Sequence, residues 1–169
     1  MTNFEMELFI LRHGEAGKGS ATRNDFQRSL TVTGKQELEE IAKAFVKLGL
    51  EFDFVFTSPL IRCKQTAEII LKYVDSKNKV ETINELRPEG NKLELYNRLS
   101  KLKQDSSTLL VGHEPYLSEL IGEAIGEINC RINLKKAGFA MIRIISLQPK
   151  IKGELRWLLT PKHMKKISK

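Results

Sequence analysis

The stretch Glu7-Leu8-Phe9-Ile10-Leu11-Arg12-His13-Gly14-Glu15, residues 7–15, decides how the rest of the chain is interpreted. Residues 7–11 are a short, mostly apolar run that stops at Arg12, His13 and Gly14, which predicts a buried strand running into a loop. Residues 12–30 show no periodicity and contain several Gly, Ser and Asn, so we expect a long loop there. The first strand therefore delivers an arginine and a histidine to the start of a loop, where binding and catalytic residues concentrate.

Strand-like and helix-like segments alternate along the rest of the chain. Thr31 or Thr33 is placed to cap a helix whose apolar residues recur at helical spacing until Gly49 ends it. This alternation implies a mostly parallel central sheet with helices on both faces, so we expect one three-layer α/β domain over residues 1–169, with 162–169 as a basic C-terminal tail. The other segments are predicted as strands at 53–58, 80–83, 108–111, 139–146 and 155–160, the last two forming a hairpin around 149–153, and as helices at 59–73, 92–102 and 115–124.

Composition places the chain among soluble globular proteins, with 41% apolar and 29% charged residues in a length of 169 that fits one domain. No apolar run is long enough to cross a bilayer, and acidic rather than basic residues precede the first apolar run, which argues against a secretory signal. We therefore expect a cytoplasmic protein with no membrane partner. Cys63 and Cys130 lack CxxC spacing and are expected to be reduced, structural thiols.

The net charge of +7 and the isoelectric point near 9.4 raise the question of nucleic acid binding. The basic residues are scattered, however, and no zinc-finger, RNP or helix-turn-helix signature accompanies them, so we expect no nucleic acid partner. The densest basic cluster is the tail, where a solvated end is the favoured interpretation and attraction to an acidic partner is the alternative. The tail lysines are Lys162, Lys165, Lys166 and Lys169, and His163 between them is expected at the surface.

Polar residues follow three predicted strands at their carboxyl ends. Arg12 and His13 follow the first strand, Ser58 and then Arg62 follow the second, and His113 follows the strand at 108–111. Because ligands of open α/β sheets bind outside the carboxyl ends of the strands, we expect these side chains to converge. Two histidines and two arginines in one crevice suit the binding and attack of a phosphoryl group.

Each residue type has a role in that chemistry. The guanidinium groups of Arg12 and Arg62 match phosphate oxygens and keep their charge at all relevant pH values. A neutral imidazole is a competent nucleophile near neutral pH, provided that a backbone carbonyl or similar acceptor holds the other ring nitrogen of His13. Gly14 permits a close approach of backbone to ligand. We expect His113 to donate a hydrogen bond or positive charge from the far side of the phosphoryl group.

Four ordered blocks resemble the histidine phosphatase superfamily, whose fold is phosphoglycerate-mutase-like. Residues 11–15 (Leu-Arg-His-Gly-Glu) are similar to its signature, and residues 28–34 to the R-P-L-T-x-x-G segment of one subgroup, with Ser29 in place of the usual proline. Residues 57–67 are similar to the S-P-x-x-R-x-x-Q-T-A block and residues 111–115 to the G-H-x-P block. Their order and spacing, and the length of the chain, look like the SixA-type phosphohistidine phosphatases, minimal members without a large lid insertion.

The resemblance implies a phosphohistidine intermediate at His13, a phosphate pocket formed by Arg12, Arg62 and His113, and no metal or other cofactor. The preferred substrate is phosphohistidine on a protein, because the minimal subgroup has an open site, and a small phosphate ester is the alternative. A phosphate-binding adaptor without catalysis is the third hypothesis. Residue chemistry alone specifies only a phosphoryl group, and the oligomeric state is left open.

Proton transfer to the leaving group requires a further side chain. Glu85 occupies the position where related family members carry the acid, and Glu114 occupies its position in the other branch of the superfamily; Glu85 is preferred. Arg28 is expected at the rim of the pocket, with a plain surface arginine as the alternative. Ser58 is expected to cap the helix or orient Arg62 rather than act as a nucleophile, because no G-x-S-x-G elbow surrounds it, and Glu15 to support the loop after His13.

Overall fold

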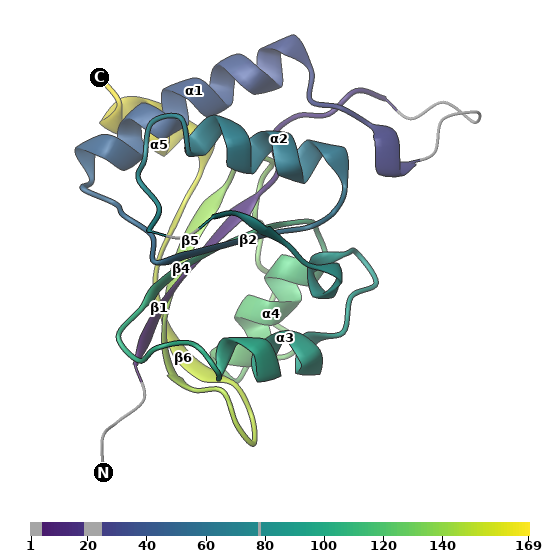
Figure 1. Ribbon diagram of the computed structural model, residues 1–169, viewed down its shortest axis with the longest axis vertical. Helices are drawn as coiled ribbons and strands as arrows, with labels where there is room; N and C mark the ends of the chain where they lie inside the picture. The colour runs from purple at the N-terminus through teal and green to yellow at the C-terminus, as the bar shows by residue number, and fades with distance from the viewer. Residues whose placement is uncertain (1–4, 19–24, 78) are drawn as a thin grey trace.

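The computed structural model describes residues 5–18, 25–77 and 79–169, so residues 19–24 of the predicted loop lie outside the described residues. The described residues form one α/β domain of six strands, five α-helices and two 3₁₀ turns, arranged in three layers (Figure 1). The strands are β1 (Met6–Arg12), β2 (Phe54–Thr57), β3 (Glu81–Thr82), β4 (Ser107–Gly112), β5 (Phe139–Ser146) and β6 (Lys152–Leu159). The helices are α1 (Val32–Lys47), α2 (Ile61–Ile70), α3 (Lys92–Leu99), α4 (Tyr116–Ala124) and α5 (Pro161–Ile167), with turns η1 (Asp25–Gln27) and η2 (Asn84–Leu86).

The sheet has the order β3-β2-β4-β1-β5-β6 and is mostly parallel, as the alternation of elements predicts. Strands β3, β2, β4 and β1 pair in parallel, whereas β5 pairs antiparallel to both β1 and β6. The antiparallel β5–β6 pair is the predicted hairpin. Because β1 lies between β4 and β5 and five of its seven residues are buried, the loop that leaves its carboxyl end starts in the middle of the domain.

Helices cover both faces of the sheet, and each face has its own hydrophobic core. Helices α1, α2 and α5 pack on one face, where their apolar residues join Phe9, Phe139 and other residues of the sheet. Helices α3 and α4 pack on the opposite face, around residues such as Leu8 and Ile10. Successive residues of β1 thus enter opposite cores, which is the pattern expected of a strand buried on both sides.

Helix α1 shows how closely local sequence signals determine an element. Thr31 is the N-cap, with its side chain accepting a hydrogen bond from the N–H of Gly34 at 2.9 Å, so the first of the two predicted caps is the one used. The helix ends before Gly49, whose φ of +65° is the left-handed conformation typical of a glycine beyond a helix C-terminus. The predicted helix at 59–73 begins two residues later, at Ile61, and it and the predicted helix at 92–102 both end earlier than expected, in turns that do not continue the α-helix.

The C-terminal segment differs from its prediction. A solvated basic tail was expected over 162–169, but residues 161–167 form helix α5, which packs beside α1. The cause is Met164, which has no exposed surface and belongs to the core beneath α1 and α2. His163 is exposed, as expected, and caps the helix through contacts with Thr160. Ile167 packs against the same core and Lys165 pairs with Glu37 of α1, so these contacts together with Met164 dock the segment.

No helix among the described residues has the length and apolar character needed to span a membrane.

Candidate active site

The structure brings four of the residues singled out from the sequence into one cavity of about 320 Å³ at the carboxyl ends of β1, β2 and β4. Arg12 ends β1 and His13 follows it, His113 follows β4, and Arg62 lies in the first turn of α2 after β2. The parallel order of these strands places their carboxyl ends side by side, which is why the residues converge. The cavity is also lined by Ala16, Asp25, Arg28, Pro88, Glu114 and Lys136.

His13 is held as a neutral imidazole with a defined orientation. Its Nδ1 lies 2.7 Å from the carbonyl oxygen of Gly14, and its Nε2 lies 3.3 Å from Nε of Arg62. Burial lowers the pKa of His13 to about 4, an effect opposed by the Gly14 carbonyl and reinforced by the charges of Arg62, Arg12 and Lys136. In the neutral ring, Nδ1–H donates to the carbonyl oxygen of Gly14, and the lone pair of Nε2 accepts a hydrogen bond from Nε–H of Arg62.

The loop after His13 is fixed by backbone contacts with three other segments. The N–H of His13 donates to Gly112, and its carbonyl accepts from Ala137. The N–H of Gly14 donates to the hydroxyl of Thr66 in α2 at 3.2 Å. These bonds tie the loop to β4, to α2 and to the segment before β5. Contacts with three distant segments therefore fix the position of the imidazole.

Packing against α1 gives a structural reason for the glycine at position 14. A Cβ atom there would lie 2.7 Å from Cδ1 of Leu38, a buried residue of α1. Helix α1 also packs closely against Glu15. A Cβ atom at Gly34 would lie 2.4 Å from the carbonyl oxygen of Glu15, so only glycine fits at this point of the helix. The hydroxyl of Thr31 donates to the carboxylate of Glu15 at 3.2 Å, so Glu15 does contact the supports of this loop.

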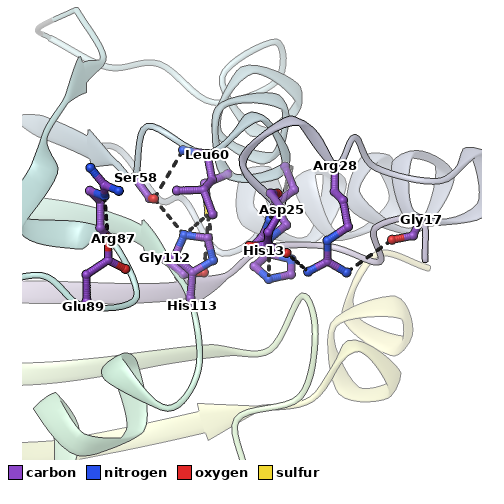
Figure 2. A network of polar contacts seen from close by, with 12 residues as sticks. His13, Gly17, Asp25, Arg28, Ser58, Leu60, Arg87, Glu89, Gly112 and His113 are labelled. Carbon is purple, nitrogen blue, oxygen red and sulfur yellow. Dashed lines mark hydrogen bonds and ion pairs between the residues drawn. The ribbon is translucent and has the colours of Figure 1, made fainter. Parts of the chain in front are cut away.

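Arg62 is 3% exposed, and both terminal nitrogens of its guanidinium bind Asp25. Its Nη1 donates to the carbonyl oxygen of Asp25 at 2.9 Å and its Nη2 to the carboxylate of Asp25 at 3.0 Å. The same carboxylate pairs with Arg28 at 2.6 Å, and Arg28 donates to the carbonyl of Gly17, so Arg28 lies in the cavity wall beside His13 (Figure 2). Although partial burial acts to raise it, the hydrogen bond and charge of Arg62 and the charge of Arg28 lower the pKa of Asp25.

His113 lies beside His13, with ring centroids 5.2 Å apart. Its Nε2 is 2.7 Å from the hydroxyl of Ser58, which also accepts from the N–H of Leu60, as Figure 2 shows. Burial, followed by the proximity of His13 and Arg62, lowers the pKa of His113 to about 3. Ser58 therefore contacts His113 rather than Arg62. Cys63 is also in contact, 3.4 Å from the same nitrogen, but burial raises the pKa of its thiol and keeps it protonated.

The segment before β5 completes the cavity. Arg12 donates from Nη1 to the carbonyl of Leu134 at 2.8 Å, while its buried Nε has no hydrogen-bond acceptor among the described residues. The buried Nε of Arg28 is in the same situation. Because buried donors are almost always paired in native proteins, these two N–H groups are suited to donate hydrogen bonds to an anionic ligand. Lys136, from the same segment as Leu134, adds a further positive charge at the cavity wall.

The two candidate acids occupy different places. Glu114 lines the cavity next to His113, with its carboxylate accepting from the N–H of Ser118 at 3.0 Å. Glu85 does not line the cavity: it is paired with Arg98 at 2.8 Å and faces α3. The structure therefore brings Glu114, and not the preferred Glu85, to the site.

Two cavity residues, Asp25 and Lys136, were not found from the sequence. Asp25 lies in the long loop without periodicity, and Lys136 in a segment outside the four recognised blocks, so neither had a local signal. With three arginines, one lysine and two neutral histidines, the cavity suits a compact anion with several oxygen atoms. Over the described ranges, no group of three or more His, Cys, Asp or Glu side chains is placed to hold a metal ion.

Comparisons with known proteins agree with this geometry. The family model of the histidine phosphatase superfamily (branch 1) matches residues 8–89. An uncharacterised protein of Picosynechococcus sp. is 35% identical over 93% of this chain and 98% of its own. The phosphohistidine phosphatase SixA homolog of Haemophilus influenzae is 30% identical over 73% of this chain and 80% of its own. A solved structure of the protein histidine phosphatase SixA complexed with tungstate superposes with a TM-score of 0.81, at 27% identity over 93% of this chain and 98% of that one.

Proposed function

The chain belongs to the histidine phosphatase superfamily, and from this premise we propose that it is a metal-independent phosphatase that hydrolyses phosphohistidine on proteins through a phosphoryl group carried on His13. The single observation that carries the proposal is the state of His13. It is a neutral imidazole, fixed through Nδ1 by the Gly14 carbonyl, with Nε2 facing the guanidinium of Arg62.

In the first step the lone pair of Nε2 attacks phosphorus while the bond from phosphorus to the substrate nitrogen breaks. The electron pair of that bond passes to the leaving imidazole, which takes up a proton. Arg12, Arg28 and Arg62 neutralise the charge on the phosphoryl oxygens. We assign the unpaired Nε–H groups of Arg12 and Arg28 as hydrogen-bond donors to these oxygens. The Gly14 carbonyl stabilises the positive ring of the phosphorylated His13 through the bond from Nδ1–H.

In the second step a water molecule attacks phosphorus from the opposite side and the bond to Nε2 breaks. The proton of the water passes to a base, and His13 returns to its neutral form, ready for another cycle. We assign the proton transfers of both steps to Glu114 because it lines the cavity beside His113, whereas Glu85 is paired with Arg98.

Exchanging each carboxylate for an amide separates these two residues. With an alkyl phosphate as substrate, whose leaving group needs a proton, Glu114→Gln is expected to lower kcat by about 100-fold. Glu85→Gln is expected to change kcat by less than about threefold, since an ion pair of this kind contributes mainly to stability. Steady-state kinetics of both variants provide the measurement, and the reverse order of losses would return the role to Glu85.

The substrate class is supported by the relatives. The Haemophilus protein is a phosphohistidine phosphatase homolog by name, and the solved structure is of a protein histidine phosphatase with tungstate, a tetrahedral oxyanion like phosphate. A P–N bond also suits a site in which Glu114 alone is assigned to proton transfer, because an imidazole leaves more easily than an alkoxide. Both cysteines are free, which supports action in the reducing cytoplasm. We also propose that the chain acts as one histidine phosphatase domain.

The decisive assay compares two peptides of one sequence, one carrying phosphohistidine and the other phosphoserine, in the presence and absence of EDTA. The proposal predicts a kcat/KM at least about tenfold higher for the phosphohistidine peptide and no effect of EDTA. A higher kcat/KM for phosphoserine or for small phosphate esters would instead assign the site to phosphomonoesters. Loss of activity with EDTA would contradict the metal-independent mechanism, and binding of phosphate without turnover would identify a non-catalytic adaptor.

A further inference from the structure

A second hollow of about 710 Å³ adjoins the cavity, and we call it the basic groove. It runs between helix α5 and the segment before β5, and it shares Arg12 and Lys136 with the cavity that holds His13. A chain lying in the basic groove therefore ends at the proposed site of phosphoryl transfer. Seven of its lining residues are basic and one, Glu37, is acidic.

The positive charge of the basic groove is largely unpaired. Glu37 is already neutralised by Lys165 at 2.6 Å. The other five lysines of the lining form no ion pair with any described residue; they are Lys135, Lys136, Lys162, Lys166 and Lys169. Since the chain has a net charge of +7, this groove concentrates much of the excess in one place.

The docking of α5 is what directs these lysines to one side. Positions 162, 165 and 166 are spaced i, i+3 and i+4, so they share one face of α5, and Lys169 follows two residues beyond the end of the helix. Met164, on another face, is fully buried in the core beneath α1, and this fixes the rotation of the helix. The lysines that the sequence assigns to a solvated tail are therefore held as a row along the wall of the groove.

We propose that the basic groove binds an acidic segment of the phosphoprotein substrate, next to the phosphorylated side chain that enters the cavity. The inference rests on the proposed function, because the acidic segment belongs to the same phosphoprotein whose phosphorylated side chain enters the cavity. Helix α5 spans seven residues, roughly 10 Å at 1.5 Å per residue, which corresponds to about three residues of extended polypeptide. Specificity therefore resides in two or three acidic side chains near the phosphohistidine.

The lining favours an acidic polypeptide over other anionic macromolecules. Single-stranded nucleic acids are bound by aromatic side chains on which bases stack, and the lining contains none. Six of the seven basic residues are lysines, whereas arginine is preferred for nucleic acid recognition. Membrane surfaces require apolar residues that insert beside the basic ones, and Pro161 is the only apolar residue of the lining. An acidic peptide needs only lysines to bind, because the lysines of the lining can pair with its carboxylates.

The test uses two phosphohistidine peptides that differ only in the flanking residues, Asp and Glu in one and Asn and Gln in the other. Wild-type protein is expected to show a KM roughly tenfold lower for the acidic peptide, with similar kcat, and this advantage is expected to disappear between about 0.05 M and 0.5 M NaCl. The variant Lys162→Ala/Lys166→Ala/Lys169→Ala is expected to lose the advantage while hydrolysing the neutral peptide normally. None of these three lysines forms an ion pair with a described residue, so we expect the triple variant to retain the fold.

The matched control is Lys101→Ala/Lys103→Ala/Lys150→Ala, which removes the same charge from exposed positions outside the groove and is expected to keep the preference. Equal KM values for both peptides in the wild type, or an equal loss in both triple variants, would overturn the inference while leaving the phosphatase function intact. Failure to hydrolyse either peptide would instead refute the proposed function. Stronger inhibition by a single-stranded RNA oligomer than by a poly-glutamate peptide of equal charge would assign the groove to nucleic acid.

Discussion

Replacing His13 by asparagine is expected to abolish phosphatase activity, with a loss in kcat of at least about 10⁴-fold. Asparagine is polar and smaller than histidine, and it has no ring nitrogen with a basic lone pair, so the covalent intermediate cannot form. The measurement is mass spectrometry of protein mixed with a phosphodonor and quenched without acid, because the P–N bond of phosphohistidine is labile to acid. Wild-type protein is expected to carry one phosphoryl group that decays with time, and His13→Asn none.

His163→Gln provides the matched control, since it removes a histidine that is exposed on α5 and away from the cavity. It is expected to form the adduct and to turn over as the wild type does. An adduct that persists in His13→Asn, or activity that survives in it, would place the nucleophile elsewhere. The histidine count of three makes the assignment by peptide mapping straightforward.

Replacing Arg62 by alanine is expected to lower kcat/KM by about 10³-fold, because a buried cation beside the nucleophile is removed. Arg62→Lys is expected to recover only part of this loss, since an ammonium group lacks the planar fork that matches phosphate oxygens. The charge of Arg62 also lowers the pKa of His13. In Arg62→Lys that charge is retained, whereas in Arg62→Ala the pKa rises and the acidic limb of the pH–kcat/KM profile moves to higher pH.

The shift of the acidic limb distinguishes a direct role from a structural one, because a merely loosened fold would lower activity at all pH values without moving it. The control is Arg98→Ala, which removes an arginine that pairs with Glu81 and Glu85 outside the cavity. Its activity is expected to stay within about threefold of the wild type. An unshifted profile in Arg62→Ala would show that Arg62 doesn't act on His13.

Local sequence signals predicted most of the fold because each depends on residues that are close together in the chain. The apolar run before Arg12, the Thr31 cap and Gly49 beyond α1 each determine an element within a few residues of themselves. Strand alternation with helices then fixes the parallel sheet, and the sheet brings Arg12, His13, Arg62 and His113 together. These residues could be singled out because Arg12 ends a strand, His13 and His113 directly follow one, and Arg62 lies in the first turn of the helix after one.

The features that the sequence did not predict depend on contacts between distant residues. Arg98 captures Glu85 across 13 positions, and Asp25 reaches Arg62 across 37, without a periodic pattern in either case. Lys136 reaches the cavity because the N–H of Ala137 and the carbonyl of His13 are hydrogen-bonded. Met164 docks α5 although the residues around it are lysines. In all these cases tertiary packing, rather than local preference, decides the position.

The carboxylate of Asp25 on Arg62 has a consequence for the end of the catalytic cycle. It accepts from Nη2 of Arg62, so any phosphate that binds this arginine through Nη2 has to displace Asp25. As an attached group, Asp25 acts at an effective concentration of about millimolar or higher and takes over the guanidinium as the product departs. Exchange of one anion for another avoids leaving the arginines without a counter-charge. A cavity rich in cations is thereby expected to release its product readily, and to resist inhibition by the free phosphate of its surroundings.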